Sequence, residues 1–253
     1  MDAPPEKHGL TLGATRELLL PVSVLGCFAL YYLAEQPFWV VLVCAVPMLV
    51  LYAMAPLWAA KSMASFDRDA VDLLAARKSD ELRRRYARAL GLRLFGVPAL
   101  RAERKAMVLA ECGDARGARE AYREALEEHA ERAPLRVMLG FAHSSFTLGD
   151  DVRAIAMYKK LLASAPSLPG VERNLAHALV RQGEDLQVAL SMLARAEREP
   201  LDEVQKQQLK LLRGLAHAKL GDHTRAQQLL AEADSSHEQT AALRSELLQR
   251  LLA

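Results

Sequence analysis

The sequence has few cysteines, almost no net charge and none of the short motifs that mark common enzyme sites. Of its three cysteines, Cys27 and Cys44 lie in an apolar stretch and Cys112 stands apart, so no CxxC or Cys/His spacing indicates zinc. A formal net charge of +2 predicts no bulk attraction to nucleic acid. The chain also lacks the GxxxxGKS/T, GxGxxG, HExxH and nucleophile-elbow motifs. We therefore expect a protein that is not an enzyme and has no cofactor or metal.

Charge is nearly absent near the N-terminus, where residues 18–60 contain a single charged residue, Glu35. The run divides at Glu35-Gln36-Pro37 into apolar segments of 17 and 23 residues. A helix needs about 20 apolar residues to cross a bilayer, with roughly 17 as the lower limit. These lengths predict a hairpin of two membrane-spanning helices after an N-terminal tail over residues 1–17. A cleaved signal sequence is the alternative, but Tyr32 stands where a small residue is expected.

The basic residues that flank this hairpin predict its orientation. The turn has no Lys or Arg, whereas residues 77–105 contain ten basic and three acidic residues. Because basic flanks stay on the cytoplasmic side, both termini are expected in the cytoplasm. Six cations are expected to contact anionic lipid headgroups: Arg77, Lys78, Arg83, Arg84, Arg85 and Arg88. The alternative is a solvated helix face that only sets the topology. The 24 arginines against 9 lysines fit a GC-rich bacterial genome, so the membrane is predicted to be a bacterial inner membrane.

One short pattern occurs four times between residues 113 and 233. A glycine and an acidic residue precede an alanine, then a tyrosine or leucine one turn later, then a small or apolar residue. The copies are Gly113-Asp114, Ala118, Tyr122 and Ala125; Gly149-Asp150, Ala154, Tyr158 and Leu161; Gly183-Glu184, Ala189, Leu193 and Ala196; and Gly221-Asp222, Ala226, Leu230 and Ala233. The flanking apolar spacing is helical, so each copy predicts a helix hairpin in which the glycine ends one helix and the acid begins the next.

The glycines are spaced by 36, 34 and 38 residues, and this period and pattern resemble the tetratricopeptide repeat (TPR). The resemblance covers about residues 99 to 240. It implies an all-α solenoid of stacked helix hairpins over residues 99–253, with a concave protein-binding groove. The alanines would let the two helices of a hairpin approach, and the residues one turn later would fill the space between repeats. No copy has the family's tryptophan near its start, and the third copy has a one-residue insertion between glycine and alanine.

Segments on both sides of the copies complete the predicted solenoid. Residues 61–98 are a basic juxtamembrane helical segment, and Leu82, Tyr86 and Ala89 make it a candidate for a further, degenerate repeat. At the other end, Ser235 to Glu238 has a capping-box pattern. An apolar stripe follows, made of Leu243, Leu247, Leu248, Leu251 and Leu252. The stripe predicts a helix that caps the solenoid, with a dimerisation helix as the alternative.

The resemblance also implies which residues line the groove. In TPR proteins these are mainly the second, fifth, ninth and twelfth positions of each first helix. The corresponding residues are Leu100, Glu103, Met107 and Ala110; Arg136, Leu139, His143 and Phe146; Gly170, Arg173, His177 and Val180; and Lys210, Arg213, His217 and Leu220. Asn174, at a sixth position, is the one match to the residues with which some TPR grooves clamp a C-terminal carboxylate, so that clamp is not expected. The four cations favour an acidic, amphipathic or extended peptide.

The three groove histidines, His143, His177 and His217, raise the question of a metal site. Equivalent positions on neighbouring hairpins lie about 10 Å apart, whereas metal ligands lie within about 2 Å of one ion. No Asp, Glu or Cys accompanies the histidines at these positions. We expect them to be polar groove residues that give binding a weak pH response.

These features favour a membrane-anchored TPR adapter that holds a protein segment at the bilayer. The alternative is an assembly or quality-control factor for envelope complexes that acts through its transmembrane helices, where small residues such as Gly26 and Ala45 allow close helix contacts. An enzyme of unrecognised type would need a catalytic constellation that the sequence does not contain. Nucleic-acid binding through RRRYARALGLR has the charge but only Tyr86 and Phe95 as stacking groups. Protein partners and membrane lipids are therefore expected, and nucleic acid is not.

Overall fold

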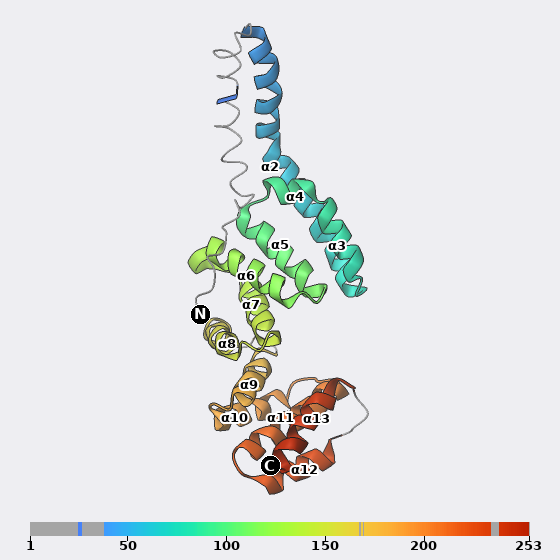
Figure 1. Ribbon diagram of the computed structural model, residues 1–253, viewed down its shortest axis with the longest axis vertical. Helices are drawn as coiled ribbons and strands as arrows, with labels where there is room; N and C mark the ends of the chain where they lie inside the picture. Colours follow the sequence, from blue (N-terminus) through green and yellow to red (C-terminus); the bar gives the residue numbers. More distant parts are fainter. Residues whose placement is uncertain (1–24, 27–37, 167, 169, 234–237, 253) are drawn as a thin grey trace, which may run out of the picture. The chain divides into compact units, whose positions relative to one another are not determined.

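The computed structural model describes residues 25–26, 38–166, 168, 170–233 and 238–252, and these residues form helices and no strands. This confirms the all-α prediction for the described part of the chain. The helices are α2 (Phe38–Ala75), α3 (Ser79–Arg88), α4 (Leu90–Phe95), α5 (Pro98–Glu111), α6 (Ala115–His129), η1 (Ala130–Arg132), α7 (Leu135–Thr147), α8 (Asp151–Ser164), α9 (Val171–Gln182), α10 (Leu186–Ala196), α11 (Glu203–Lys219), α12 (His223–Glu232) and α13 (Glu238–Leu252) (Figure 1). They form two units, Met1–Ala133 and Pro134–Ala253.

The recurring Gly-Asp pairs make the turns within the helix hairpins, as the sequence predicts. Each glycine of the four copies has a φ between +79° and +85°, a left-handed conformation that side-chain-bearing residues rarely adopt. Asp114, Asp150 and Asp222 then cap α6, α8 and α12, because each carboxylate accepts a hydrogen bond from the backbone N–H three residues later, at 2.9, 3.3 and 3.1 Å. Through these two features, three residues are enough to end one helix and start the next.

In the third copy the second helix begins three residues after the glycine, one residue later than in the other copies. Its inserted residue moves the start of α10, so Asp185 rather than Glu184 occupies the N-cap position. Asp185 has a φ of +47° and its side chain makes no capping hydrogen bond. The insertion is therefore accommodated by a strained turn residue, and the prediction that the acid after the glycine begins the helix is wrong for this copy.

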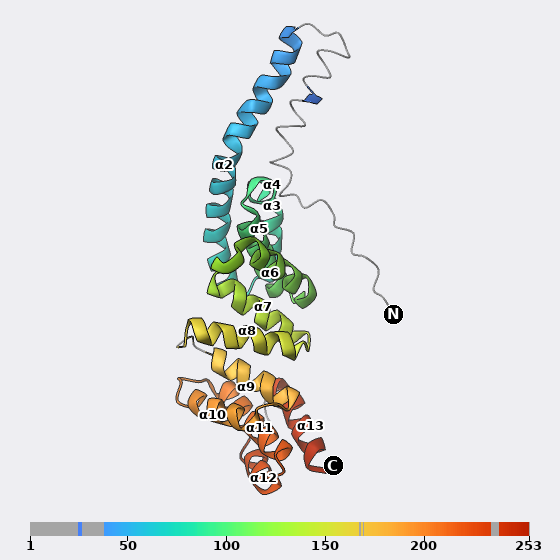
Figure 2. The same cartoon turned by 90° about the vertical axis from the view of Figure 1, so that its left-hand side faces the viewer.

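The second unit contains three helix hairpins followed by α13. The hairpins are α7 with α8, α9 with α10, and α11 with α12, and α8 also packs against α9 (Figure 2). Ala154, Ala189 and Ala226 are fully buried where the two helices of each hairpin meet, and Tyr158 and Leu193 are fully buried one turn later. Small residues at the contact and a large one beside it account for the close packing of successive hairpins.

Helix α13 closes the second unit by packing against α11 and α12. Leu247 is fully buried in a cluster with Leu211, Ala218 and Ala226. A methyl group added at Gly214 would lie 2.8 Å from the Leu247 Cδ2 atom, so the glycine makes the space for this leucine. Of the predicted stripe, Leu243 and Leu251 also pack against this cluster, whereas Leu248 and Leu252 are exposed. The capping-box pattern lies outside the described residues except for Glu238.

The first unit contains the α5/α6 hairpin and a second core built on α2. Phe66 and Ala70 of α2 are buried with Leu82 and Ala89 of the α3 segment and with Val108 of α5. Tyr86 packs edge-on against Phe66, with ring centroids 5.6 Å apart. The last turns of α2 and the helix α3 thus pack on α5 much as one helix pair of a solenoid packs on the next. That residues 61–98 contain a degenerate TPR repeat stays a prediction.

Helix α2 is one continuous helix, and the apolar segment of the sequence runs directly into the basic one. It continues through Pro47 and Pro56 and bends along its length (Figure 2). Side chains of its first part face solvent, among them Val43, Val46, Leu49, Val50, Met54 and Leu57. Within the described residues, Leu49–Ala75 is the one stretch of helix long and apolar enough to cross a membrane. The first predicted span and the turn, residues 18–37, lie outside the described residues apart from residues 25–26.

The short helix α4 depends on a glycine that lets it approach α2. A methyl group at Gly91 would lie 2.8 Å from the Trp58 carbonyl oxygen and 2.9 Å from the Ser62 Cβ atom. Because the Trp58 carbonyl belongs to the backbone, α4 would have to move. We expect Gly91→Ala to cost about 1–3 kcal/mol, the usual range for overpacking, and to lower the midpoint of unfolding followed by Trp58 fluorescence. An unchanged midpoint would show that α4 is not seated on α2.

Candidate protein-binding face

The predicted groove positions of the second unit lie on α7, α9 and α11, the first helices of its three hairpins. On α7, Arg136 and His143 are exposed and Leu139 and Phe146 are half-buried. The α9 residues Arg173, Asn174 and His177 are half-buried, as are Lys210, Arg213 and His217 of α11, while Leu220 at the end of α11 is 41% exposed. We call these eleven residues the first-helix face: Arg136, Leu139, His143, Phe146, Arg173, Asn174, His177, Lys210, Arg213, His217 and Leu220.

Six predicted groove residues do not belong to this face: Leu100, Glu103, Met107 and Ala110 of the first unit, and Gly170 and Val180 of the second. Val180 is fully buried, so its side chain packs in the core between helices and cannot touch a bound peptide. Met107 lies in the first unit, where it packs against the core around Phe66 and Val108. Val180, at the twelfth position of its repeat, is buried because α9 packs against three neighbouring helices, α8, α10 and α11.

Phe146 and His177 bring α7 and α9 together. Their rings meet edge to face with centroids 4.8 Å apart and an interplanar angle of 67°. Such pairs are favoured by the quadrupole of the aromatic ring. The sequence predicts both residues as groove lining, and the structure brings Phe146, in the last turn of α7, into contact with His177, in the middle of α9.

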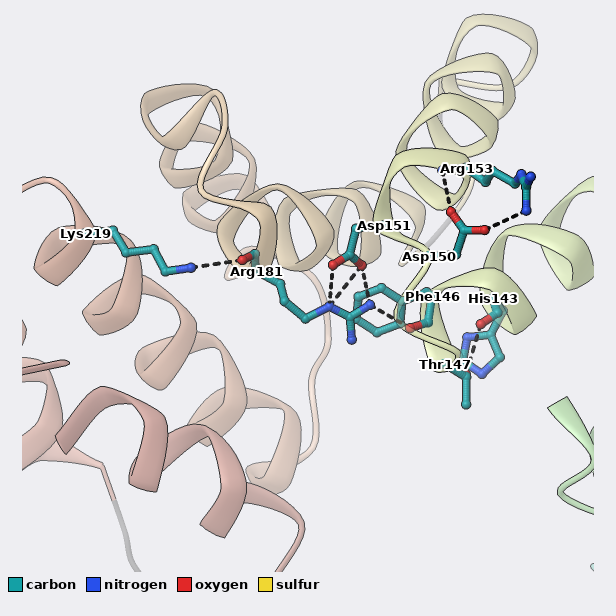
Figure 3. Close-up of polar contacts among 8 residues, drawn as sticks. All are labelled: His143, Phe146, Thr147, Asp150, Asp151, Arg153, Arg181 and Lys219. Atoms are coloured by element: carbon teal, nitrogen blue, oxygen red, sulfur yellow. Dashed lines mark hydrogen bonds and ion pairs between the residues drawn. The ribbon is translucent and has the colours of Figure 1, made fainter. Parts of the chain in front are cut away.

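Arg181, which the groove pattern does not include, is the centre of the polar contacts beside this ring pair (Figure 3). Its Nε atom donates to both carboxylate oxygens of Asp151, at 2.9 and 2.7 Å, and its Nη2 atom also donates to Asp151. The same Nη2 donates to the Phe146 carbonyl oxygen at 2.6 Å, and the guanidinium lies 4.0 Å from the centre of the Phe146 ring. Arg181 therefore joins the end of α7 and the start of α8 to α9.

Lys219 has the corresponding role one hairpin later. Its ammonium donates to the carbonyl oxygens of Val180 and Arg181, at 2.7 and 3.0 Å (Figure 3). These carbonyls belong to the last turn of α9, which has no partners of its own for its final C=O groups. A cation there also complements the negative end of the helix dipole.

Both cations could have been found in the sequence. Arg181 and Lys219 stand two residues before the glycine of their copies, Gly183 and Gly221. The same position holds Glu111 in the first copy and Thr147 in the second. Thr147 donates instead to the His143 carbonyl oxygen of its own helix, at 2.9 Å (Figure 3). A basic residue at this position thus indicates contact with the preceding hairpin.

Two of the four predicted groove cations are engaged within the unit. Arg213 forms an ion pair with Glu197, and Lys210 donates to the Glu232 carbonyl oxygen at 3.3 Å. His217 also has a partner, since its Nδ1 atom lies 3.2 Å from the Asp222 carboxylate. Arg136 of α7, which is exposed, and Arg173 of α9, which is half-buried, add positive charge to the first-helix face, and the charges on α11 are partly neutralised by their neighbours.

Asn174 faces the core side of the first-helix face, next to α8. Burial raises the pKa of the Tyr158 hydroxyl to about 12, and the side chains of Asn174 and Arg181 oppose this shift. Asn174 is thus close enough to act on a buried tyrosine of the preceding hairpin. Its position fits a structural role between repeats as well as contact with a ligand.

His177 is held in its neutral form. The pKa of His177 is lowered to about 4, mainly by burial and also by the charge of Arg181, while Asp151 opposes the shift. Since the ordinary value is 6.5, a histidine in the unfolded chain takes up a proton at a higher pH than His177 does in the folded chain. Its contribution to stability is complete above pH 6.5 and is lost as the pH falls toward 4.

Lowering the pH from 7 to 4 should reduce the free energy of unfolding of the second unit in both wild type and His177→Gln. We expect the reduction to be about 2 kcal/mol larger in wild type, after allowance for partial exposure of His177. The measurement is hydrogen exchange of α7 and α9 amides in both proteins at the two pH values. The carboxylates titrate in both proteins, so their effect cancels when the two reductions are compared. Equal losses in the two proteins would show that His177 is not held neutral.

The six basic residues predicted at the membrane surface are in different environments. Arg77, Lys78, Arg83, Arg84 and Arg88 are exposed. Arg85 instead pairs with Asp69 and donates to the Ser65 hydroxyl at 2.6 Å, so it ties α3 to α2. Nearby, Arg104 of α5 donates two hydrogen bonds to the carboxylate of Asp67 of α2, at 2.9 and 2.8 Å. Membrane contact by the five exposed cations stays a prediction.

Among the described residues, no group of three or more His, Cys, Asp or Glu side chains lies close enough to hold a metal ion. No protein-family profile and no curated protein matches the chain. Solved structures do. PilW, a type IV pilus biogenesis factor, superposes with a TM-score of 0.54 at 17% identity, covering 94% of this chain and 99% of PilW.

The Cut9–Hcn1 hetero-tetramer of the APC/C superposes with a TM-score of 0.51 at 16% identity, over 92% of this chain. The fold is a TPR-like helical repeat. This chain spans about half of the second neighbour's length, 49%. At these identities the likeness concerns the fold, and the roles of the individual face residues have to be argued from their own geometry.

Proposed function

We propose that this protein is a membrane-anchored scaffold that binds a protein segment on the first-helix face and holds it at the bilayer. The observation that carries the proposal is the combination, in one chain, of a TPR-like repeat and a helix that exposes large apolar side chains between Val43 and Trp58. Such a surface on α2 needs lipid or protein around it. The repeat supplies a rigid array of helices on which a segment can lie.

The expected ligand is an acidic or amphipathic segment. Arg136 and Arg173 carry positive charge on α7 and α9, and Leu139 and Phe146 of α7 add half-buried apolar surface. A segment that carries both acidic and apolar residues matches this combination of charge and apolar surface. Holding that segment near the membrane raises its effective concentration for other membrane components. No catalytic role is proposed for any residue of the face.

Anchoring is proposed to use two spans, residues 18–34 and the first part of α2, with both termini in the cytoplasm of a bacterium. The full chain should stay in the membrane pellet after alkaline carbonate extraction. Leu25→Arg with Val50→Arg should release it, because these changes put a charge near the centre of each proposed span, where it costs about 2.5–3.5 kcal/mol. Val71→Arg, an exposed site nearer the end of α2, is the control and should remain in the pellet. Release of the wild-type chain would contradict the anchoring.

Binding is tested by charge reversal on the face. Arg136→Glu with Arg173→Glu should abolish co-purification of the partner from solubilised native membranes. Lys159→Glu with Lys160→Glu places the same charges on α8, where both lysines are exposed, and should leave the partner bound. Equal retention in the two variants would place the binding surface elsewhere.

The alternative function is assembly or quality control of envelope complexes through the transmembrane helices. The structural neighbour PilW is a biogenesis factor, which is a role of this kind. Crosslinks from Gly26 or Ala45 to another membrane protein, with none from the first-helix face, would favour this alternative over the adapter.

A further inference from the structure

The first unit contains a cationic pocket that the groove pattern does not predict. The pocket has a volume of about 470 Å³ and is formed by α3, α4, α5 and α6. Its charged and aromatic lining consists of Arg83, Tyr86, Arg93, Arg101, Lys105 and Glu124. Four cations therefore face one carboxylate. The volume is in the range of small-ligand sites, roughly 300–1,000 Å³, and the balance of charge selects an anion.

Arg101 is the reason to expect a ligand in this pocket. The residue is only 8% exposed, and its Nη1 atom is buried without a hydrogen-bond partner among the described residues. Its nearest carboxylate, Glu124, lies 4.0 Å from Nη2, which is too far for a hydrogen bond. A buried guanidinium has five N–H donors, and leaving them unpaired is costly. An anionic group in the pocket would supply the missing acceptors.

The other cations are arranged around this site. Arg93 is held in place because its Nη1 donates to the Ala87 carbonyl oxygen at 3.0 Å, and its guanidinium lies 5.9 Å from the centre of the Tyr86 ring. Arg83 of α3 and Lys105 of α5 are exposed and make no salt bridge with another described residue. The site thus contains the buried Arg101, with Arg93 held beside it. Arg83 and Lys105 are exposed and can adjust their positions, so several oxygens of one group can be bound.

The pocket lies next to the end of the apolar part of α2. Arg93 belongs to α4, and α4 packs against α2 at Trp58 and Ser62, where Gly91 permits the contact. The Trp58 and Phe95 rings also meet there, with centroids 5.6 Å apart. Tryptophan near the end of a span marks the level of the lipid headgroups. If α2 crosses the bilayer as proposed above, the pocket is close to the phosphates of the cytoplasmic leaflet.

We propose that the pocket formed by Arg83, Arg93, Arg101 and Lys105 binds the phosphate group of an anionic lipid headgroup. The site differs from the first-helix face in position and in ligand, and it rests on the proposed membrane anchoring only for the source of the phosphate. Bidentate contacts from the arginines would recognise the phosphate oxygens, and Lys105 would add a point charge. A headgroup bound there would hold the first unit at the membrane surface.

The test uses the full chain in detergent and isothermal titration calorimetry with dihexanoyl phosphatidylglycerol below its micellar concentration. Arg83→Gln with Lys105→Gln should weaken binding at least about tenfold, because two charged contacts are lost. Arg84→Gln with Arg88→Gln is the matched control. It removes the same charge from α3, from exposed arginines outside this pocket, and binding should change by less than about twofold.

Inorganic phosphate in place of the lipid distinguishes the two sources. Phosphate that binds as tightly as the lipid, with the same dependence on Arg83 and Lys105, would keep the phosphate site and overturn the lipid as its source. No binding of either compound, or equal weakening in both variants, would overturn the site itself. The titration does not depend on α2 spanning a bilayer, so failure of the anchoring proposal would appear in the carbonate extraction and not here.

Discussion

Replacing Arg181 by methionine is expected to lower the stability of the second unit by about 2–3 kcal/mol. The substitution keeps the aliphatic packing but removes the ion pair with Asp151, the hydrogen bond to the Phe146 carbonyl and the contact with the Phe146 ring. Breaking a buried pair costs about 3–5 kcal/mol, and the cost here is smaller because the Arg181 side chain is 34% exposed. Hydrogen exchange should show the loss first in α7, α8 and α9.

Arg153→Met is the matched control for this prediction. Arg153 also pairs with an aspartate at the start of α8, since its Nη1 lies 2.8 Å from Asp150, but its side chain is 64% exposed. An exposed pair contributes about 0–1 kcal/mol, so the control should behave nearly as wild type. If the two variants lost protection equally, Arg181 would be one more surface charge and not a connection between hairpins.

Replacing Leu247 by alanine is expected to cost about 3 kcal/mol and to release α13. Leu247 is fully buried in the cluster with Leu211, Ala218 and Ala226, and its Cδ2 atom fills the space that Gly214 leaves. Truncation of a buried leucine to alanine costs about 2–5 kcal/mol, because a cavity remains. Since α13 is the last helix of the unit, we expect its amides to lose protection together with the facing side of α11.

Leu248→Ala tests whether the effect belongs to the buried position. Leu248 is the next residue of the same helix, and it is 41% exposed. The Leu248→Ala variant should change the free energy of opening, measured by hydrogen exchange in α13 and α11, by less than about 0.5 kcal/mol, as is usual for surface positions. Detachment of α13 by this variant too would mean that the whole predicted stripe is an interface, which is the expectation for a dimerisation helix.

Local chemistry made much of the fold predictable from the sequence. A glycine followed by aspartate ends one helix and starts the next through contacts within three residues, so the turns at Gly149 and Gly221 could be read directly. The same holds for the alanines, because a methyl group at a fixed distance from the turn is a local signature of close helix packing. The turn at Asp185 was mispredicted because an inserted residue changes which acid reaches the N-cap.

Contacts between hairpins were not predictable in the same way. Asp151 and Arg181 are 30 residues apart, and nothing in either segment alone shows that they pair. Val180 was assigned to the groove by register, yet the packing of α8, α10 and α11 around α9 buries it. The sequence does not predict the cationic pocket, because it assigns Arg83 to the membrane surface and counts Arg93 and Lys105 only among the basic residues that set the topology. The meeting of these three residues with Arg101 depends on how α3, α4 and α5 pack.

These findings bear on how the protein would bind a partner. A face built on α7 and α9 is held in shape by Arg181, which joins both hairpins, so binding and stability share this residue. Substitutions of Arg181 would therefore affect capture through the shape of the face. Arg136 and His143 are exposed, which makes them the better positions for probing the partner itself.

The most direct measurement is site-specific photo-crosslinking in native membranes from His143, with Lys160 on α8 as the matched control position. Both side chains are exposed on the second unit, and only His143 belongs to the first-helix face. The account predicts one dominant protein adduct from His143, lost when Arg136 and Arg173 are changed to Glu, and no such adduct from Lys160. Identical adducts from both positions, or none from His143, would contradict the proposal that this face binds a protein segment.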